Sequence, residues 1–289
     1  MRNYIKNKVI NNFTINNYIG GLGNNLQQIA LGCMYANLYN KNFYIKKHFQ
    51  INEFSIINNK FSNFLHNYRH SSQFYYFDSE VDLFLNNPEE DYPLNRKDQK
   101  YYNYNFYDTF QKYIEPNLIK NEDYEFDSET LLIHIRSGDI YSKDKLHPYY
   151  LQNPLVYYEN LIKQYKKTII ITGKPFNNPV ISNLSNKKNL EVISSDIKTD
   201  FSLLLGAQNL ATSGVGTFAV AAALGSKKLK NFHYSNIFFK HHLNPTMVKN
   251  VVHNQYKFNN YIELGTRWTN SEEQKNLMVS KKVQISELR

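Results

Sequence analysis

The stretch "LLIHIRSGDIYS", residues 131–142, places an apolar run directly before a cation, a glycine and an anion. Residues 131–135 are typical of a buried strand, and Arg136 then marks the tip of that strand. Gly138 follows where the backbone can turn sharply, and a guanidinium beside it can bind phosphate oxygens bidentately. The alternative from these residues alone is that Arg136 and Asp139 simply pair with each other in a strand-ending loop.

Outward from this strand, apolar runs alternate with amphipathic segments from residue 127 onward. This alternation predicts an α/β fold of Rossmann type, in which a parallel sheet is joined by crossover helices. The expected strands cover 130–136, 166–173, 189–194, 209–213 and, as the last of the series, 228–234. The expected helices cover 154–165, 177–187, a segment that starts at 200, and 217–225.

Ligands of such sheets bind outside the carboxyl ends of the strands. The tips at 136–139, 172–174, 194–200 and 213–217 are therefore expected to share one crevice.

Two further features lie at these tips. His134 faces the same side of its strand as Arg136, because side chains alternate, so both are candidates for the crevice. The alternative for His134 is a hydrogen-bonded core histidine. "SGVGTF", residues 213–218, lies between a strand and a small-residue helix, so that its N–H groups and hydroxyls would suit a phosphate. The alternative there is a tight turn with Thr217 as the N-cap.

The N-terminal part opens with a separate β-loop-α unit around "GGLGNN", residues 20–25. In its helix, Leu26, Ile29, Ala30 and Cys33 keep the spacing of a core face. A dinucleotide motif is disfavoured, because Leu26 occupies the position of the third glycine and no acid ends the next strand. The loop remains a place where backbone approaches a ligand closely, with the amides of Asn24 and Asn25 at its tip.

The length of 289 residues favours one large domain or two of about 130 residues each. We expect an N-terminal domain over 1–126, a second domain over 127–265 and a helical tail over 266–289. Residues 78–126 are polar, rich in tyrosine and weakly periodic, which predicts an irregular connection with one helix near 106–119.

The net charge of +9 favours an anionic partner. Basic residues form short pairs along the chain and not one stripe, so a phosphate-bearing ligand is favoured over nucleic acid. A single cysteine excludes an internal disulfide, and neither a signal-type apolar segment nor a run of about 18 apolar residues occurs. These features predict a soluble, cytoplasmic protein without a transmembrane segment.

Metal ligands are weakly indicated. His66 and His70 are four apart and His241 and His242 are adjacent, but no cysteine or HExxH pattern accompanies them. No Asp-x-Asp pair for Mg²⁺ or Mn²⁺ occurs either. A site for a phosphorylated ligand would then use arginine in place of a metal.

Taken together, "GGLGNN", "HIRSGD" and "SGVGTFAVAAALG" resemble the α-1,2- and α-1,6-fucosyltransferase superfamily, whose members carry GGxGNQ, H-x-R-R-G-D and S-N-S-T-F-S-type motifs in that order. The resemblance extends over most of the chain. It implies a GT-B fold with two Rossmann-like domains, a GDP-fucose donor, a glycan acceptor, no metal, and inversion at the sugar carbon.

The resemblance also implies roles for residues. Arg136 matches the arginine that binds the donor diphosphate. The resemblance assigns no general base: Asp139 is a candidate by its position alone, and it could equally orient Arg136 or cap the loop. Asp200 is a looser match to an acid that precedes a helix near the donor base or sugar. The donor-binding set expected from motifs and strand tips is Gly21, Gly23, Asn24, His134, Arg136, Asp200, Ser213, Gly216, Thr217 and Phe218.

Two departures from the family pattern leave alternatives open. Ser137 stands where the family has a second arginine. The absence of that arginine removes a charge-assisted contact of roughly 1.5–3 kcal/mol. Val215 and Gly216 replace more polar residues of the late motif. A transferase of the same fold with another nucleotide sugar, and a non-catalytic carbohydrate- or polyanion-binding module, are the alternatives.

Overall fold

A computed structural model describes residues 12–15, 18, 20–45, 48–58, 68–70, 105–142, 149–185, 187–239 and 242–288. The chain divides into two compact units, Met1–Ile119 and Lys120–Arg289. The sequence places this boundary at 126. Each unit is described by itself below, and no helix in the described part of the chain is both long enough and apolar enough to cross a membrane.

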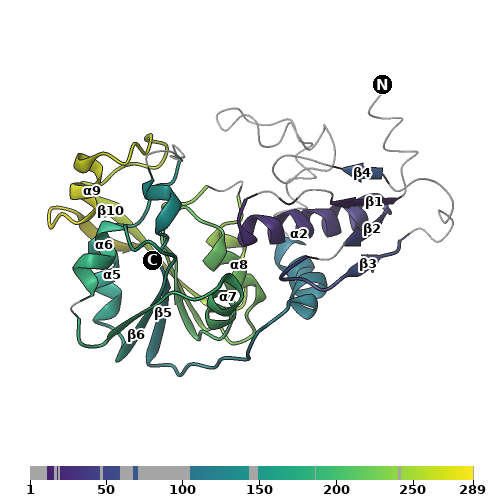
Figure 1. The fold of residues 1–289 in the computed structure, drawn as a ribbon, viewed down its shortest axis with the longest axis horizontal. Coiled ribbons are helices and arrows are strands. Elements are labelled where there is room, and N and C mark those ends of the chain that lie inside the picture. The colour runs from purple at the N-terminus through teal and green to yellow at the C-terminus, as the bar shows by residue number, and fades with distance from the viewer. Residues whose placement is uncertain are drawn as a thin grey trace. The chain divides into compact units, whose positions relative to one another are not determined.

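The second unit contains a seven-stranded sheet (Figure 1). Its strands are β5 (Thr130–His134), β6 (Lys167–Ile171), β7 (Leu190–Ile193), β8 (Asn209–Ala211), β9 (Asn231–Ser235), β10 (Val252–Asn259) and β11 (Gln284–Leu288). Their order is β11-β10-β9-β8-β5-β6-β7, and all neighbours are parallel except β10 and β11. The first six strands follow the Rossmann order, so the expected α/β class is confirmed.

Strand β5 lies at the point where this order reverses. The chain passes from β5 to β6 and β7 on one side and then returns to β8 on the other side of β5. In such sheets the ligand site lies outside the carboxyl ends of the two strands that flank the reversal. The loops after β5 and β8 are therefore the first place to look for a site.

Helices cover both faces of the sheet. They are α5 (Leu155–Ile162), α6 (Pro179–Leu184), α7 (Ile197–Leu205), α8 (Phe218–Gly225) and α9 (Glu272–Met278). Helices α5 and α6 contact each other, as do α7 and α8, and Figure 1 shows the two pairs on opposite sides of β5. Because β5 is covered on both sides, Leu131, Leu132 and Ile133 are all fully buried.

The helices α5 and α8 are buried for different reasons. In helix α5, which lies within the expected range 154–165, Tyr158, Leu161 and Ile162 follow the apolar spacing of one helix face and are buried. Tyr157 is fully buried as well, so α5 contacts the core over a wider face than its apolar spacing indicates. In α8 the small side chains of 219–223 are all buried, which allows the helix to pack close to its neighbours.

Three expectations for the second unit differ from the structure. Helix α7 starts at Ile197 and not at 200, because the side chain of Asp196 accepts from the N–H groups of Lys198 and Thr199 and caps the helix there. Strand β9 is not the last strand. The segment 266–289, expected to be a helical tail, contains α9 and then β11, which pairs with β10 in the sheet.

The first unit has its own smaller sheet. Its strands are β1 (Asn12–Ile15), β2 (Asn42–Ile45), β3 (Phe54–Ile56) and β4 (Tyr68–His70), in the order β3-β2-β1-β4. Helix α2 (Leu22–Tyr39) joins the parallel strands β1 and β2, which confirms the β-loop-α unit.

The core face predicted for α2 is also confirmed, since Leu26, Ile29, Ala30 and Cys33 are fully buried. The helix expected near 106–119 appears as a helical turn over 105–109, a π-helical turn η1 (Phe110–Ile114) and a 3-10 turn η2 (Glu115–Asn117). Residues 78–104 of the expected irregular connection lie outside the described residues.

A glycine makes the close approach between the loop after β8 and the segment 151–153 possible. Gly214 has a φ of +107°, and a Cβ atom on it would lie 2.8 Å from Leu151 O. Gly216 in the same loop has no such conflict, since the nearest atom to its Cβ position, Ser213 Oγ, is 3.8 Å away. A side chain at position 214 should therefore disturb the packing of the loop, whereas a side chain at position 216 should not.

We predict that Gly214→Ala lowers the free energy of unfolding by about 3 kcal/mol, from backbone strain and overpacking together. Gly216→Ala is the matched control and should change it by less than about 1 kcal/mol. Urea unfolding followed by the fluorescence of Trp268, the single tryptophan of the chain and buried in the second unit, measures both. Equal losses in the two variants would contradict the geometry described.

Candidate functional site

Arg136 lies two residues beyond the end of β5 and is held on two sides. Its guanidinium carbon lies 4.3 Å from the centre of the Tyr150 ring. Its Nη2 donates to Asp139 at 3.1 Å (Oδ2) and 3.4 Å (Oδ1). The Arg136 side chain keeps 27% of its surface exposed, so the guanidinium is oriented and still open to a ligand.

The next two residues are fixed to the loop after β6. Ser137 is buried, and its Oγ lies within hydrogen-bonding distance of Pro175 O (2.7 Å) and Asn177 Oδ1 (2.9 Å). The Asn177 side chain spans Gly138: Oδ1 accepts from Gly138 N–H at 2.7 Å and Nδ2 donates to Gly138 O at 3.1 Å. These contacts join the ends of two neighbouring parallel strands.

Asn178 extends the connection to the helix that follows. Its Nδ2 donates to Arg136 O at 2.9 Å, and its Oδ1 accepts from Val180 N–H at 2.9 Å, which caps α6. The backbone N–H of Asn178 also donates to Ser137 Oγ at 3.2 Å. We call the contacts made by Asn177 and Asn178 with residues 136–138 the asparagine clamp.

The loop after β8 is paired with the segment that carries Tyr150. Val215 N–H donates to Leu151 O at 2.9 Å, and Asn153 N–H donates to Ser213 O at 2.8 Å. Because Tyr150 contacts Arg136 and Leu151 contacts Val215, the segment 150–153 brings the two loops that flank the switch point together.

The phosphate cradle expected over 213–218 is narrower than predicted. The N–H of Val215 is already used by Leu151 O, so it does not face a ligand. Thr217 stands at the N-cap position of α8, and its side chain makes no capping hydrogen bond. The part of the loop that can offer a backbone donor is therefore narrowed to the surroundings of Gly216, while Ser213 is buried.

His134 lies beside this loop. Its ring centre is 5.1 Å from that of Phe218, the first residue of α8, and Phe218 in turn lies 5.4 Å from Phe201 of α7. Burial, and to a lesser extent the charge of Arg136, lower the pKa of His134 to about 3. The histidine is therefore a neutral, aromatic neighbour of the Arg136 loop at physiological pH.

Asp200 has a structural partner. It lies within the first turn of α7, not before the helix as expected, because α7 starts at Ile197. Its Oδ1 accepts from Ser195 N–H at 3.0 Å in the loop after β7, and burial raises its pKa. In the structure, Asp200 orders that loop.

The remaining expected residues belong to the first unit. Gly21 is the N-cap residue of α2, and Gly23 and Asn24 lie in its first turn. The backbone N–H groups of Asn24 and Asn25 both donate to Gly21 O, at 3.0 and 3.1 Å, so these two amides are used within the loop. Gly21, Gly23 and Asn24 are thus part of an ordered helix start in a unit separate from that of Arg136.

A buried histidine supports this helix start. His48 Nδ1 accepts from Gln50 N–H at 3.1 Å, so its Nε2 carries the proton and lies 3.3 Å from Asn25 Oδ1. Burial lowers the pKa of His48 to about 4. Sequence reasoning missed His48, because nothing local distinguishes a lone histidine that contacts a loop 23 residues away.

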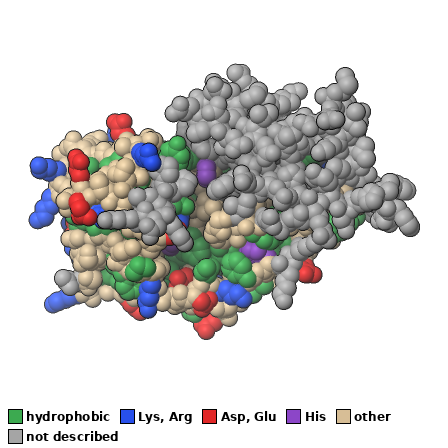
Figure 2. Space-filling view, turned by 45° about the horizontal axis from the view of Figure 1, so that its top comes forward, with side chains coloured by type: hydrophobic (Ala, Val, Ile, Leu, Met, Phe, Trp, Pro, Cys, Tyr) green, Lys and Arg blue, Asp and Glu red, His purple; other side chains and the backbone are tan. Residues whose placement is uncertain are grey.

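Of the histidine pairs considered for a metal, His66 and His241 lie outside the described residues. Within the described ranges, no group of three or more His, Cys, Asp or Glu side chains is arranged to hold a metal ion. Among the described residues on the face in Figure 2, the Lys and Arg side chains lie scattered among Asp and Glu side chains.

Comparison with known proteins does not add to this geometry. No protein-family model matches the chain, and no curated protein matches its sequence. The assignment of function therefore depends on the motifs and on the contacts described above.

We predict that Ser137→Arg lowers the free energy of unfolding by about 3 kcal/mol. This change would give the loop the two adjacent arginines of the H-x-R-R-G-D motif. The loss of stability is expected because position 137 is buried and its hydroxyl holds the loop after β6. Ser137→Ala, which removes only the hydroxyl, should cost about 1 kcal/mol. Urea unfolding followed by Trp268 fluorescence measures both, and an arginine variant as stable as wild type would contradict the burial.

A second prediction concerns pH. In the unfolded chain His134 has a pKa of about 6.5, whereas in the folded chain its pKa is about 3. Between these two pH values the unfolded chain binds a proton that the folded chain does not, so the free energy of unfolding falls as the pH drops. His134→Gln should therefore lose about 2 kcal/mol less than wild type between pH 7 and pH 5. The buried His233 contributes the same slope to both proteins. Parallel stability curves for the two proteins would contradict the low pKa.

Proposed function

We propose that this protein is a glycosyltransferase that transfers fucose from GDP-fucose to a glycan hydroxyl, with inversion and without a metal. The observation that carries the proposal is the position of Arg136: a partly exposed, oriented guanidinium at the carboxyl end of the strand where the sheet order reverses. We further propose that the two units are the two halves of a GT-B fold. The order of the three motifs supports both proposals.

In the proposed reaction, the acceptor hydroxyl oxygen forms a bond to the anomeric carbon of the donor. The bond from that carbon to the diphosphate oxygen breaks, and GDP leaves with the electron pair. Arg136 and the backbone N–H groups of the loop after β8 stabilise the charge that grows on the diphosphate. The hydroxyl proton passes to a base, for which Asp139 is the candidate by position.

The contacts of Asp139 favour a second role for it. Its carboxylate accepts from Arg136 Nη2, so it fixes the direction in which the guanidinium points. A base would need its carboxylate near the acceptor hydroxyl. Asp139→Asn separates the roles: loss of turnover with unchanged GDP affinity indicates a base, whereas a change in GDP affinity indicates orientation of Arg136.

Two alternatives remain open. One is a transferase of the same fold that uses another nucleotide sugar, motivated by Ser137 in place of the second arginine. The other is a non-catalytic module that binds a carbohydrate or a polyanion, motivated by the same residue and by the net charge of +9. Both keep the anion site at Arg136, but only the first predicts turnover of a donor.

The test is calorimetric titration with GDP-fucose, other GDP-sugars and UDP-sugars, followed by assay of nucleotide release. We expect binding of GDP-fucose and slow release of GDP. Arg136→Ala should lower the rate about 10²–10³-fold, because it removes a group that stabilises the leaving diphosphate. Lys166→Ala, at the opposite end of the sheet and paired with Glu129, is the control and should leave the rate unchanged.

The outcomes separate the alternatives. Binding of UDP-sugars without binding of GDP-sugars would exclude the fucose donor and keep a transferase. Binding without nucleotide release would favour the non-catalytic module. Equal loss of activity in the Arg136 and Lys166 variants would show that the site is elsewhere.

A further inference from the structure

The proposed diphosphate site has too little positive charge if Arg136 acts alone. A nucleoside diphosphate carries more than one negative charge at neutral pH, and Asp139 already lies 3.1 Å from the guanidinium. Ser137, the neighbouring position, is buried and holds the loop after β6, so it contributes no charge. A second cation would have to come from another part of the sheet edge.

The loop after β6 supplies a lysine next to Arg136. Strands β5 and β6 are parallel, with His134 opposite Ile171, so Arg136 and Lys174 lie two and three residues beyond this pair. The asparagine clamp holds the two loops together. A Cβ atom on Gly138 would lie only 3.2 Å from Lys174 O, which shows how close the backbones are.

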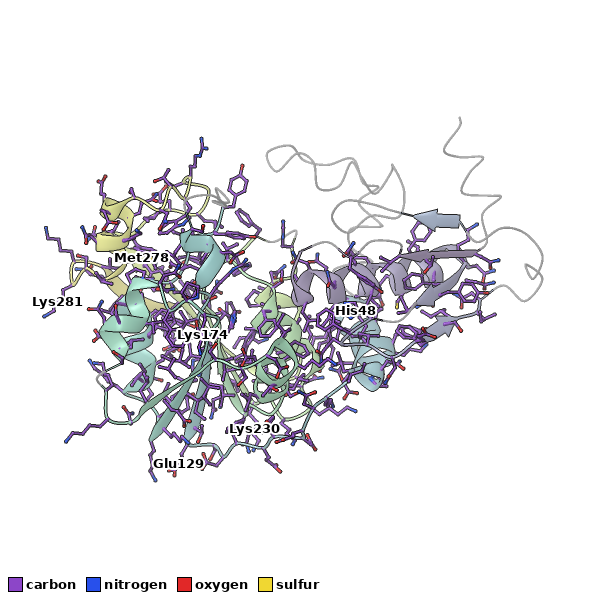
Figure 3. All side chains as sticks on the ribbon, viewed as in Figure 1. His48, Glu129, Lys174, Lys230, Met278 and Lys281 are labelled. Carbon is purple, nitrogen blue, oxygen red and sulfur yellow. The ribbon has the colours of Figure 1, made fainter. Side chains whose placement is uncertain are left out.

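The surroundings of Lys174 leave its ammonium accessible to a ligand. It is exposed and takes part in no ion pair within the described part of the chain. Figure 3 shows it in the region between helices α5 and α6 on one side and α7 and α8 on the other. By contrast, ion pairs with acidic residues hold Lys166, Lys167, Lys187, Lys228 and Lys275.

We infer that Lys174 is the second cation of the diphosphate site and binds the diphosphate together with Arg136. The inference rests on the proposed function, since it concerns the same site. The two side chains differ in a useful way: the guanidinium of Arg136 is fixed by Tyr150 and Asp139, whereas the ammonium of Lys174 is on a flexible stem and can follow a phosphate oxygen. The glycine at 138 is required because the two loops approach so closely.

The experiment is calorimetric titration of the full-length protein with inorganic pyrophosphate at low and at moderate salt. Lys174→Met should weaken pyrophosphate binding about tenfold at low salt, because one charge-assisted contact is lost, and should make binding less dependent on salt. Lys174→Arg should restore affinity to within about threefold of wild type. Unfolding followed by Trp268 fluorescence should be unchanged, since the side chain is exposed.

Lys198→Met is the matched control. Lys198 lies in the first turn of α7, after β7, at the same edge of the sheet but one strand further from β5. Its removal lowers the net charge by the same amount, so a general charge effect would weaken binding equally in both variants. We expect less than a twofold change for Lys198→Met, and equal weakening in the two variants would overturn the inference.

The outcomes also separate this inference from the proposed function. If Arg136→Ala abolishes pyrophosphate binding and Lys174→Met leaves it unchanged, Lys174 is excluded and the proposed function stands. If both variants lose affinity but no nucleotide sugar binds or turns over, the two-cation site stands and the proposed function fails. If the wild-type protein does not bind pyrophosphate at all, the two-cation site is overturned, and the titration with GDP-fucose decides the proposed function separately.

Discussion

Strand β5 is buried on both faces, and this burial determines where the charged residues of its sequence can lie. A chain that is apolar through Ile133 and Ile135 can carry Arg136 only after the strand has left the interior, since an unpaired guanidinium inside the sheet would lose its hydration. The sheet order then makes this exit part of the switch point between β5 and β8. The position of the guanidinium is thus a consequence of core formation.

The loops at this edge are held by polar side chains that bond to backbone. Asn177 and Asn178 satisfy donors and acceptors of 136–138, and Asn153 donates from Nδ2 to Thr212 O and accepts from Ser235 Oγ. Such bonds contribute modestly one by one, but each also prevents a buried polar group from being left without a partner. The edge is consequently ordered before any ligand arrives.

Much of the second unit was predictable from the sequence because its strands are continuous apolar runs with turn residues between them. The exceptions have physical reasons. Strand β10 was missed because VHNQYKFN has few apolar residues and lies mostly at the surface, where pairing with β9 and β11 makes it a strand. The start of α7 was missed because the cap at Asp196, and not the apolar spacing, decides it.

The site was predictable only in part. Arg136 and the loop after β8 were identified by their places at strand ends, but Tyr150 and Asn177 were not, because their roles arise from contacts across 14 to about 40 residues that no local pattern encodes. The number of backbone donors that the loop after β8 offers to a phosphate was overestimated for the same reason, because the Val215 N–H donates to the carbonyl of Leu151. Contacts between separate loops are the information that the linear pattern lacks.

The stacking of Arg136 on Tyr150 has a consequence for the thermodynamics of binding. An arginine side chain that is free in solution loses rotamer freedom when a ligand orders it, at about 0.5–1.5 kcal/mol per immobilised side chain. Here the Tyr150 ring at 4.3 Å and the Asp139 carboxylate at 3.1 Å already restrict the guanidinium. The loss of rotamer entropy therefore occurs when the chain folds and not when the ligand binds. With one face covered by the ring, the guanidinium also presents its donors edge-on, which restricts the direction from which an anion can approach.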